Sequence, residues 1–249
     1  MNNVRTVSDT KRAFYSSHTR PINTIYRRVV EELMVEMHLL SVNVDFSYNP
    51  IYALGVVTAF ERFMQGYQPE KDKQSIFNAL CQAVESDPQQ YRQDAERLGL
   101  FAKNSSFPEL MAWLRGDRQQ ENDLQQQIQA IAHNPNFKYS RLFAIGVFSL
   151  LELSDPTLVK DEKQRVEALK NIAATLNISE DKLNKDLELY RANVDKMEQA
   201  LATIADILSA DRKKRQQLTP DKGVAVTTPD SDDPSQAPGS PHDKAPFSS

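Results

Sequence analysis

The apolar positions near the C-terminal end of the chain have the regular spacing of a coiled-coil helix. No glycine or proline interrupts the sequence between Glu180 and Gln217. The apolar residues there follow one another at alternating steps of four and three: Leu183, Leu187, Tyr190, Val194, Met197, Leu201, Ile204 and Leu208. A mean step of about 3.5 residues keeps one seam of a helix facing a partner. The pattern predicts a long helix whose narrow apolar seam is suited to contact.

The helix just before this seam is a candidate partner for its first half. Residues 161–176 form a charged segment with apolar residues at matching spacing, and the connection of residues 177–179 is short. A short connection favours an antiparallel helical hairpin. Such a hairpin predicts the following neighbours: Leu176 with Leu183, Leu169 with Tyr190, and Val166 with Val194.

From Met197 onward the seam has no local partner, and its apolar face widens. This half could pack on the rest of the protein, as most apolar stripes do. Alternatively it could be an exposed face that binds another protein or a second copy of the chain, or the helix could fray early. The second alternative makes the following residues candidates for partner binding: Met197, Leu201, Ile204, Ile207 and Leu208.

The first 155 residues carry the apolar spacing of helices throughout. Two segments, 51–65 and 139–153, are apolar nearly all round, so we expect them at the centre of a globular domain. Amphipathic helices are predicted around them at about 21–40, 70–85, 88–99, 106–116 and 124–133. Glycine is scarce, with 7 residues in 249, and runs of β-branched residues are absent. The sequence therefore predicts an all-α protein without a sheet.

We expect three parts along the chain. Residues 1–155 form a globular multi-helix domain with a basic N-terminal arm, and residues 156–216 form a helical hairpin that contains the long coiled-coil-like helix. Residues 217–249 are rich in Pro, Ser and Asp and have few large apolar groups, so this tail is predicted to be disordered.

Charge and composition narrow the classes of function. The net charge is −4, which argues against a polyanion-binding protein, although residues 1–28 carry a charge of +5. That basic arm includes aromatic residues, but the domain that follows is not basic, so nucleic-acid binding is not expected. No segment reaches the roughly 18 apolar residues of a membrane span. A basic cluster ends the long helix and would either complement the helix dipole or contact an anionic membrane surface: Arg212, Lys213, Lys214 and Arg215.

No catalytic, metal or cofactor pattern is present in the sequence. The four histidines are scattered, without the spacing of a metal site, and there is no glycine-rich phosphate loop and no nucleophile elbow. Cys81 is the single cysteine and lies on the apolar face of a predicted helix, where a buried, inert thiol is expected. We therefore expect a protein that is not an enzyme and needs no cofactor.

Three stretches of the sequence resemble one known family. They are RTVSDTKRAFYSSHTRPINTIYRRVVEELMVEMHLL from Arg5, FSYNPIYALGVVTAFERFMQGY from Phe46, and LFAIGVFSLLEL from Leu142. Together they closely resemble the thylakoid formation protein family, which comprises photosystem II biogenesis proteins of cyanobacteria and plastids. The resemblance covers roughly residues 1–210 and leaves the proline-rich tail uncovered.

The resemblance implies a non-enzymatic protein, soluble or peripheral at the cytoplasmic side of the thylakoid membrane. It implies a role in assembly or repair of photosystem II and association with the membrane-bound FtsH protease complex. Plastid members carry a transit peptide, and this chain begins almost directly at the shared block, so a cyanobacterial-like protein is expected. The family has no catalytic motif, so no active residue is carried over. A different reading of the seam is a self-associating coiled-coil scaffold at the membrane surface.

Overall fold

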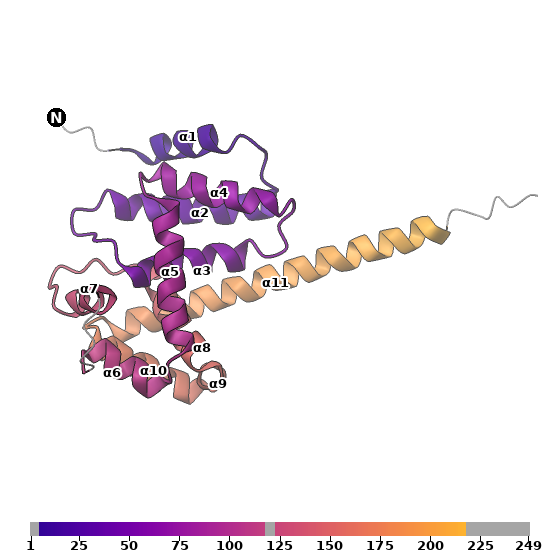
Figure 1. Ribbon diagram of the computed structural model, residues 1–249. Coiled ribbons are helices and arrows are strands. Elements are labelled where there is room, and N and C mark those ends of the chain that lie inside the picture. The colour runs from indigo at the N-terminus through magenta and orange to yellow at the C-terminus, as the bar shows by residue number, and fades with distance from the viewer. Residues whose placement is uncertain (1–4, 118–122, 218–249) are drawn as a thin grey trace, which may run out of the picture. The chain divides into compact units, whose positions relative to one another are not determined.

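The computed structural model describes residues 5–117 and 123–217, and within these ranges every regular element is a helix (Figure 1). The prediction of an all-α protein is confirmed. The tail predicted from residue 217 onward falls, from residue 218, outside the described residues. The helices are α1 (Val7–Ser17), α2 (Thr24–Ser41), α3 (Pro50–Phe63), α4 (Lys71–Ala83), α5 (Pro88–Lys103), α6 (Phe107–Arg115), α7 (Asp123–Ala132), α8 (Arg141–Ser154), α9 (Pro156–Lys160), α10 (Glu162–Thr175) and α11 (Glu180–Gln217).

Helices α3 and α8 form the centre of the core, as their all-round apolar sequences predict. Nine of the fourteen residues of α3 and ten of the fourteen of α8 are buried. Two glycines allow the backbones to cross in contact: a Cβ at Gly55 would overlap the carbonyl oxygen of Leu142, and one at Gly146 would overlap that of Ile51. Any larger side chain at either glycine would push the two central helices apart.

The remaining helices of the N-terminal part surround this pair. Helix α5 packs across both α3 and α8, and α4 packs against α5, α2 and α1, so that α1 is the outermost layer on that side (Figure 1). Helices α9 and α10 pack near the other end, against α8, and α10 also contacts α6. The core thus continues without a break from α8 into α10.

Helix α1 is not predicted by the sequence pattern, which indicates only a basic N-terminal arm for this segment. A capping box starts it, because the Thr6 side chain accepts from the backbone N–H of Asp9 while the Asp9 carboxylate accepts from that of Thr6. The Phe14 side chain, which is fully buried, fixes the helix to the core. A single aromatic anchor on an otherwise polar segment leaves little periodic signal in the sequence.

The expected end of a helix at Gly99 is wrong. Helix α5 continues to Lys103, because the apolar face continues beyond the glycine with the buried residue Ala102. At Gly99 itself the neighbouring Leu153 side chain lies 3.6 Å from the place of a Cβ. The glycine is buried at an ordinary van der Waals contact between α5 and α8 and does not end the helix.

The chain divides into two compact units, residues 1–205 and residues 206–249. Helices α1–α10 and the first part of α11, up to Ala205, belong to the first unit. The three parts expected from the sequence, 1–155, 156–216 and 217–249, stay a prediction, since the division observed concerns contacts and not independent folding.

Candidate protein-binding site on helix α11

The first half of α11 is part of the core. The seam residues Leu183, Leu187 and Tyr190 are 0%, 3% and 2% exposed. The Tyr190 ring meets Phe63 of α3 edge to face, with ring centroids 5.9 Å apart. Burial raises the pKa of the Tyr190 hydroxyl to about 12. This half of the seam is an anchor that holds the helix to the domain.

Polar contacts fix the start of α11 against the segment that leads into α8. The Tyr139 hydroxyl donates to a carboxylate oxygen of Asp186 over 2.9 Å, and the Lys182 ammonium lies 5.4 Å from the centre of the Tyr139 ring. Both contacts join residues more than 40 positions apart. They add orientation to an interface whose stability comes from apolar burial.

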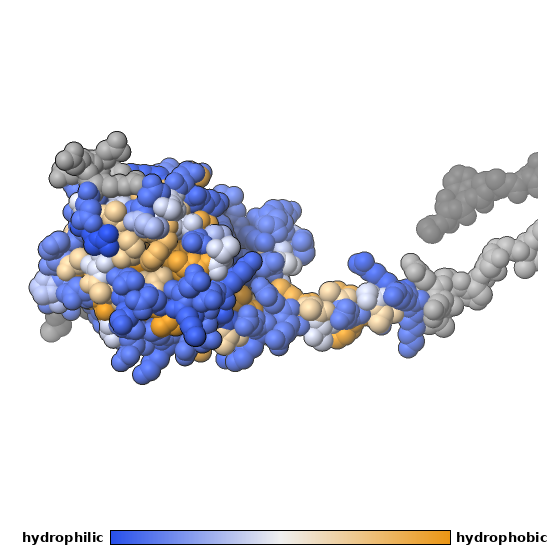
Figure 2. Space-filling model, turned by 90° about the horizontal axis from the view of Figure 1, so that it is seen from below, coloured by the Kyte–Doolittle hydropathy of each residue, from blue (hydrophilic) through white to orange (hydrophobic). Residues whose placement is uncertain are grey.

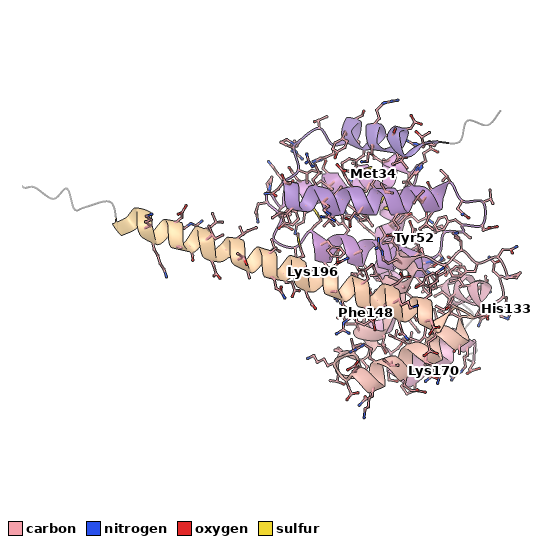
Figure 3. The ribbon with its side chains drawn as sticks, turned by 180° about the vertical axis from the view of Figure 1, so that it is seen from behind. Met34, Tyr52, His133, Phe148, Lys170 and Lys196 are labelled. Atoms are coloured by element: carbon pink, nitrogen blue, oxygen red, sulfur yellow. The ribbon has the colours of Figure 1, made fainter. Side chains whose placement is uncertain are left out.

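Helix α10 contacts the first half of α11, as the predicted hairpin requires. A small cavity of 120 Å³ lies between the two helices and α8, and Leu169 and Leu187 both line it. Phe148 of α8, labelled in Figure 3, lines it as well. Val166, which the hairpin pairs with Val194, is 42% exposed. The sequence predicts α10 alone as the partner of this half of the seam. In the structure α3 and α8 also cover it.

Exposure of the seam begins later than the sequence suggests. Met197 is 8% exposed, and Leu201 is half-buried beside Gly66, where the nearest Leu201 methyl carbon lies 3.7 Å from the place of a Cβ. The side chains of Ile204, Leu208 and Ile207 are then 37%, 54% and 59% exposed. We call these last three residues the exposed stripe; Figure 2 shows apolar residues at the surface of this helix.

The basic cluster lies one turn beyond the exposed stripe. The side chains of Arg212, Lys213 and Lys214 are exposed, and no described carboxylate lies within 4 Å of their charged nitrogens. Arg215 is helical, but its side chain falls outside the described residues. One helix thus carries an anchored seam, an exposed apolar stripe and a basic end in succession.

The cysteine and histidines singled out in the sequence lie apart from this site. Cys81 is fully buried, and burial raises the pKa of its thiol to about 12, so it is not a nucleophile at neutral pH. His18 and His38 are buried, and their Nδ1 atoms each lie 2.9 Å from a hydroxyl, of Ser75 and Thr10 respectively. Burial lowers the pKa of both imidazoles.

A metal cluster and a membrane-spanning helix are both absent from the described residues. No three histidine, cysteine, aspartate or glutamate side chains come together in a way that could hold a metal ion. No described helix combines the length and the apolar character needed to cross a membrane. His133 is exposed, and His242 falls outside the described residues.

One feature of the first unit had no signal in the sequence. A groove runs between α2 and α11, and its basic and acidic walls come from four separate segments of the chain. Met197, a candidate for partner binding, lines this groove and is not part of the exposed stripe.

The comparison with protein families decides the class of this chain. The sequence model of the family described as Thylakoid formation protein matches residues 6–219. The chain belongs to the thylakoid formation protein family. The match begins at the N-cap of α1 and extends just beyond α11, so the anchored seam, the exposed stripe and the basic cluster all lie within the family region.

Relatives and a solved structure agree with this assignment. Protein Thf1 of Nostoc punctiforme is 71% identical over 235 residues, which cover 94% of this chain and all of that protein. Protein Thf1 of Trichormus variabilis is 71% identical over 231 residues, covering 92% and 99%. A solved structure of Psb29 superposes with a TM-score of 0.75 at 44% identity, covering 85% of this chain and 99% of that one. The family resemblance seen in the sequence is confirmed.

Proposed function

We propose that this protein is a non-enzymatic accessory factor in thylakoid formation and in the assembly and repair of photosystem II. In this proposal it binds and stabilises the FtsH protease complex of the thylakoid membrane. Membership of the thylakoid formation protein family supports the general role. The observation that carries the binding mode is the exposed stripe on a helix whose other half is anchored in the core.

The stripe has the geometry of a helix that inserts into a partner's groove. Ile204, Ile207 and Leu208 stand at positions i, i+3 and i+4, which place them on one face. Complete burial of such a side chain is worth about 1.5–3 kcal/mol, so covering the exposed part of each contributes about 1 kcal/mol. Three such side chains supply a modest affinity that suits a reversible accessory contact.

The basic cluster supports a peripheral position at the cytoplasmic side of the thylakoid membrane. Exposed Arg212, Lys213 and Lys214 attract an anionic lipid surface, at about 1 kcal/mol for each charge that comes close to it. A membrane-bound protease presents its soluble parts beside such a surface. In this proposal the basic cluster contacts the membrane surface and so holds the exposed stripe close to the soluble parts of the protease.

The proposal is tested by recovery of FtsH with variants expressed in a cyanobacterial strain that lacks the native gene. Ile204→Asp with Leu208→Asp places two charges on the exposed stripe. Leu189→Asp is the matched control, because Leu189 is an exposed leucine of the same helix, 48% accessible, outside the seam. We expect FtsH recovery to fall at least about tenfold for the double variant and to stay at the wild-type level for the control. Equal recovery with all three proteins would refute the stripe as the contact.

The stripe also fits self-association, the alternative function that the sequence allows. Two copies could bury their exposed stripes against each other in a short coiled coil. Light scattering of the purified chain at tens of micromolar decides this alternative. A dimeric mass that becomes monomeric in the double variant supports it, and a monomeric wild-type mass excludes it.

A further inference from the structure

The groove between α2 and α11 consists of two adjoining parts. The first, of 460 Å³, has apolar walls from α3, α8 and α11, including Phe63, Ile145 and Met197. The second, of 1230 Å³, is wider and is lined by α2, the segment before α8, and the start of α11. Arg28, Glu32, Glu36 and Arg141 line both parts, so the two form one continuous groove, which we call the α2–α11 groove.

The groove is positively charged, although the whole chain is negative. Its lining holds more basic than acidic side chains, by seven to four, whereas the chain has a net charge of −4. The basic residues are Lys11, Arg27, Arg28, Lys138, Arg141, Lys182 and Lys196. The acidic residues are Glu31, Glu32, Glu36 and Asp186. A cationic groove on an anionic protein indicates a ligand or partner with negative charge.

The acidic side chains are already engaged within the protein. Glu31 pairs with Lys11 over 3.2 Å, Glu32 with Arg28 over 3.1 Å, and Glu36 with Arg141 over 2.6 Å. Asp186 accepts the hydrogen bond from the Tyr139 hydroxyl. Three of the four carboxylates thus pair with a basic residue of the lining, and Asp186 keeps its charge, so the lining as a whole has three more basic than acidic side chains.

Three exposed basic side chains of the lining have no such pairing. No described carboxylate lies within 4 Å of the charged nitrogens of Arg27, Lys138 or Lys196. Lys196, labelled on α11 in Figure 3, lines the apolar part, while Arg27 and Lys138 line the wide part. The surplus charge is thus present along both parts of the groove.

The form of the groove favours a protein segment over a membrane. Its lining on α2 extends from Thr24 to Leu40, which corresponds to about 24 Å of helix at about 1.5 Å per residue. Its floor includes residues as deeply buried as Ala59 and Ile145, at 2% and 3% exposure. A flat bilayer surface cannot reach such a floor, whereas the side chains of an inserted helix can.

We propose that the α2–α11 groove binds an acidic, amphipathic helical segment of a partner protein. The apolar side chains of that segment enter the part of the groove lined by Phe63, Ile145 and Met197. Its carboxylates face Arg27, Lys138 and Lys196. This surface is separate from the exposed stripe, so the inference goes beyond the proposed function and does not depend on it.

The test uses two synthetic helical peptides of about 18 residues, the number that spans the groove. Both carry leucines at i, i+3, i+4 and i+7; one has glutamate at the polar positions and the other has lysine. Fluorescence anisotropy with the full chain should show binding of the glutamate peptide that weakens as salt is raised from about 0.05 to 0.3 M. Equal binding of the lysine peptide, or no binding of either at about 1 mM, would overturn the proposal.

Substitutions then locate the binding. Lys138→Glu with Lys196→Glu should weaken binding of the glutamate peptide at least about tenfold, because two attractive charges become repulsive. Lys170→Glu is the matched control, since Lys170 is an exposed lysine of α10 outside the groove (Figure 3). The affinity of this control variant for the glutamate peptide should stay within twofold of wild type. All three substituted lysines are exposed, and circular dichroism checks that each variant is folded.

Two further outcomes separate this proposal from its competitors. Ile204→Asp with Leu208→Asp should leave peptide affinity unchanged; a loss as large as that of the groove variant would place the binding at the exposed stripe and overturn the inference. Vesicles rich in phosphatidylglycerol, tested with the same variants, probe a lipid surface. Vesicle binding that depends on Lys138 and Lys196, without peptide binding, would also overturn it.

Discussion

Leu187 and Leu208 occupy equivalent positions on the seam of α11, three heptads apart, but their surroundings differ. Leu187 is 3% exposed within the core, and Leu208 is 54% exposed on the stripe. Replacing each by alanine removes the same atoms from the same helix. The pair therefore isolates the contribution of packing, because helix propensity and chemical change are held constant.

The expected magnitudes follow from burial. Truncation of a buried leucine removes its transfer free energy and leaves a cavity, so Leu187→Ala should lower the free energy of unfolding by about 3 kcal/mol. Leu208 gives up little buried surface, and alanine favours helix slightly more than leucine does. Leu208→Ala should therefore change the free energy of unfolding by less than about 0.5 kcal/mol.

Urea unfolding followed by circular dichroism measures both values, if the slope with denaturant is the same in the two variants. The measurement is made at two protein concentrations, because self-association through the stripe would stabilise the wild type in a concentration-dependent way. Equal losses for the two variants would refute the division of the seam into an anchored and an exposed half. So would a loss below about 0.5 kcal/mol for Leu187→Ala.

Three other predictions concern the core and its polar contacts. Gly146→Ala should destabilise the protein by about 3 kcal/mol or more in thermal unfolding, since its Cβ would overlap the Ile51 carbonyl, and a change within about 0.5 kcal/mol would contradict the close crossing. Burial lowers the pKa of His18 and His38, so the unfolded chain takes up more protons below about pH 6.5. The free energy of unfolding should therefore fall as the pH drops through that value, and that of the His38→Gln variant should fall less steeply. Identical pH profiles for wild type and variant would disprove the assignment of this pH dependence to His38. Tyr139→Phe should cost about 1 kcal/mol in urea unfolding, by loss of its hydrogen bond to Asp186, and a neutral effect would show that this bond does not orient α11.

The sequence predicts helices well where local chemistry marks their ends. Asn49 caps α3 by accepting from the backbone N–H of Tyr52, and Asp87 caps α5 in the same way through Gln89. Gly116, with φ +81°, ends α6 as predicted. Each of these signals depends on residues within four positions of one another, so the sequence alone contains them.

The errors and omissions arise where distant segments decide. Gly99 reads as a stop signal, yet it is buried inside α5 beside Leu153, 54 positions away. Leu201 reads as part of the unpartnered half of the seam, yet it is half-buried beside Gly66, in the connection after α3. Neither contact could be inferred from spacing along one segment.

The two candidate surfaces also differ in whether their residues are close together in the sequence. The exposed stripe could be predicted because its residues share one helix, although the sequence placed its beginning at Met197 and not at Ile204. The α2–α11 groove could not, since Lys138 and Lys196 come from segments 58 positions apart and line the two parts of one groove only in the folded chain.

The most direct test of the central claim is the affinity of the purified chain for the purified FtsH complex, measured with immobilised protease. The claim predicts that wild type and Leu189→Asp bind with the same dissociation constant. It predicts that Ile204→Asp with Leu208→Asp binds at least about tenfold more weakly, while its circular dichroism stays that of the wild type. An unchanged dissociation constant for the folded double variant would contradict the claim that the exposed stripe is the docking face.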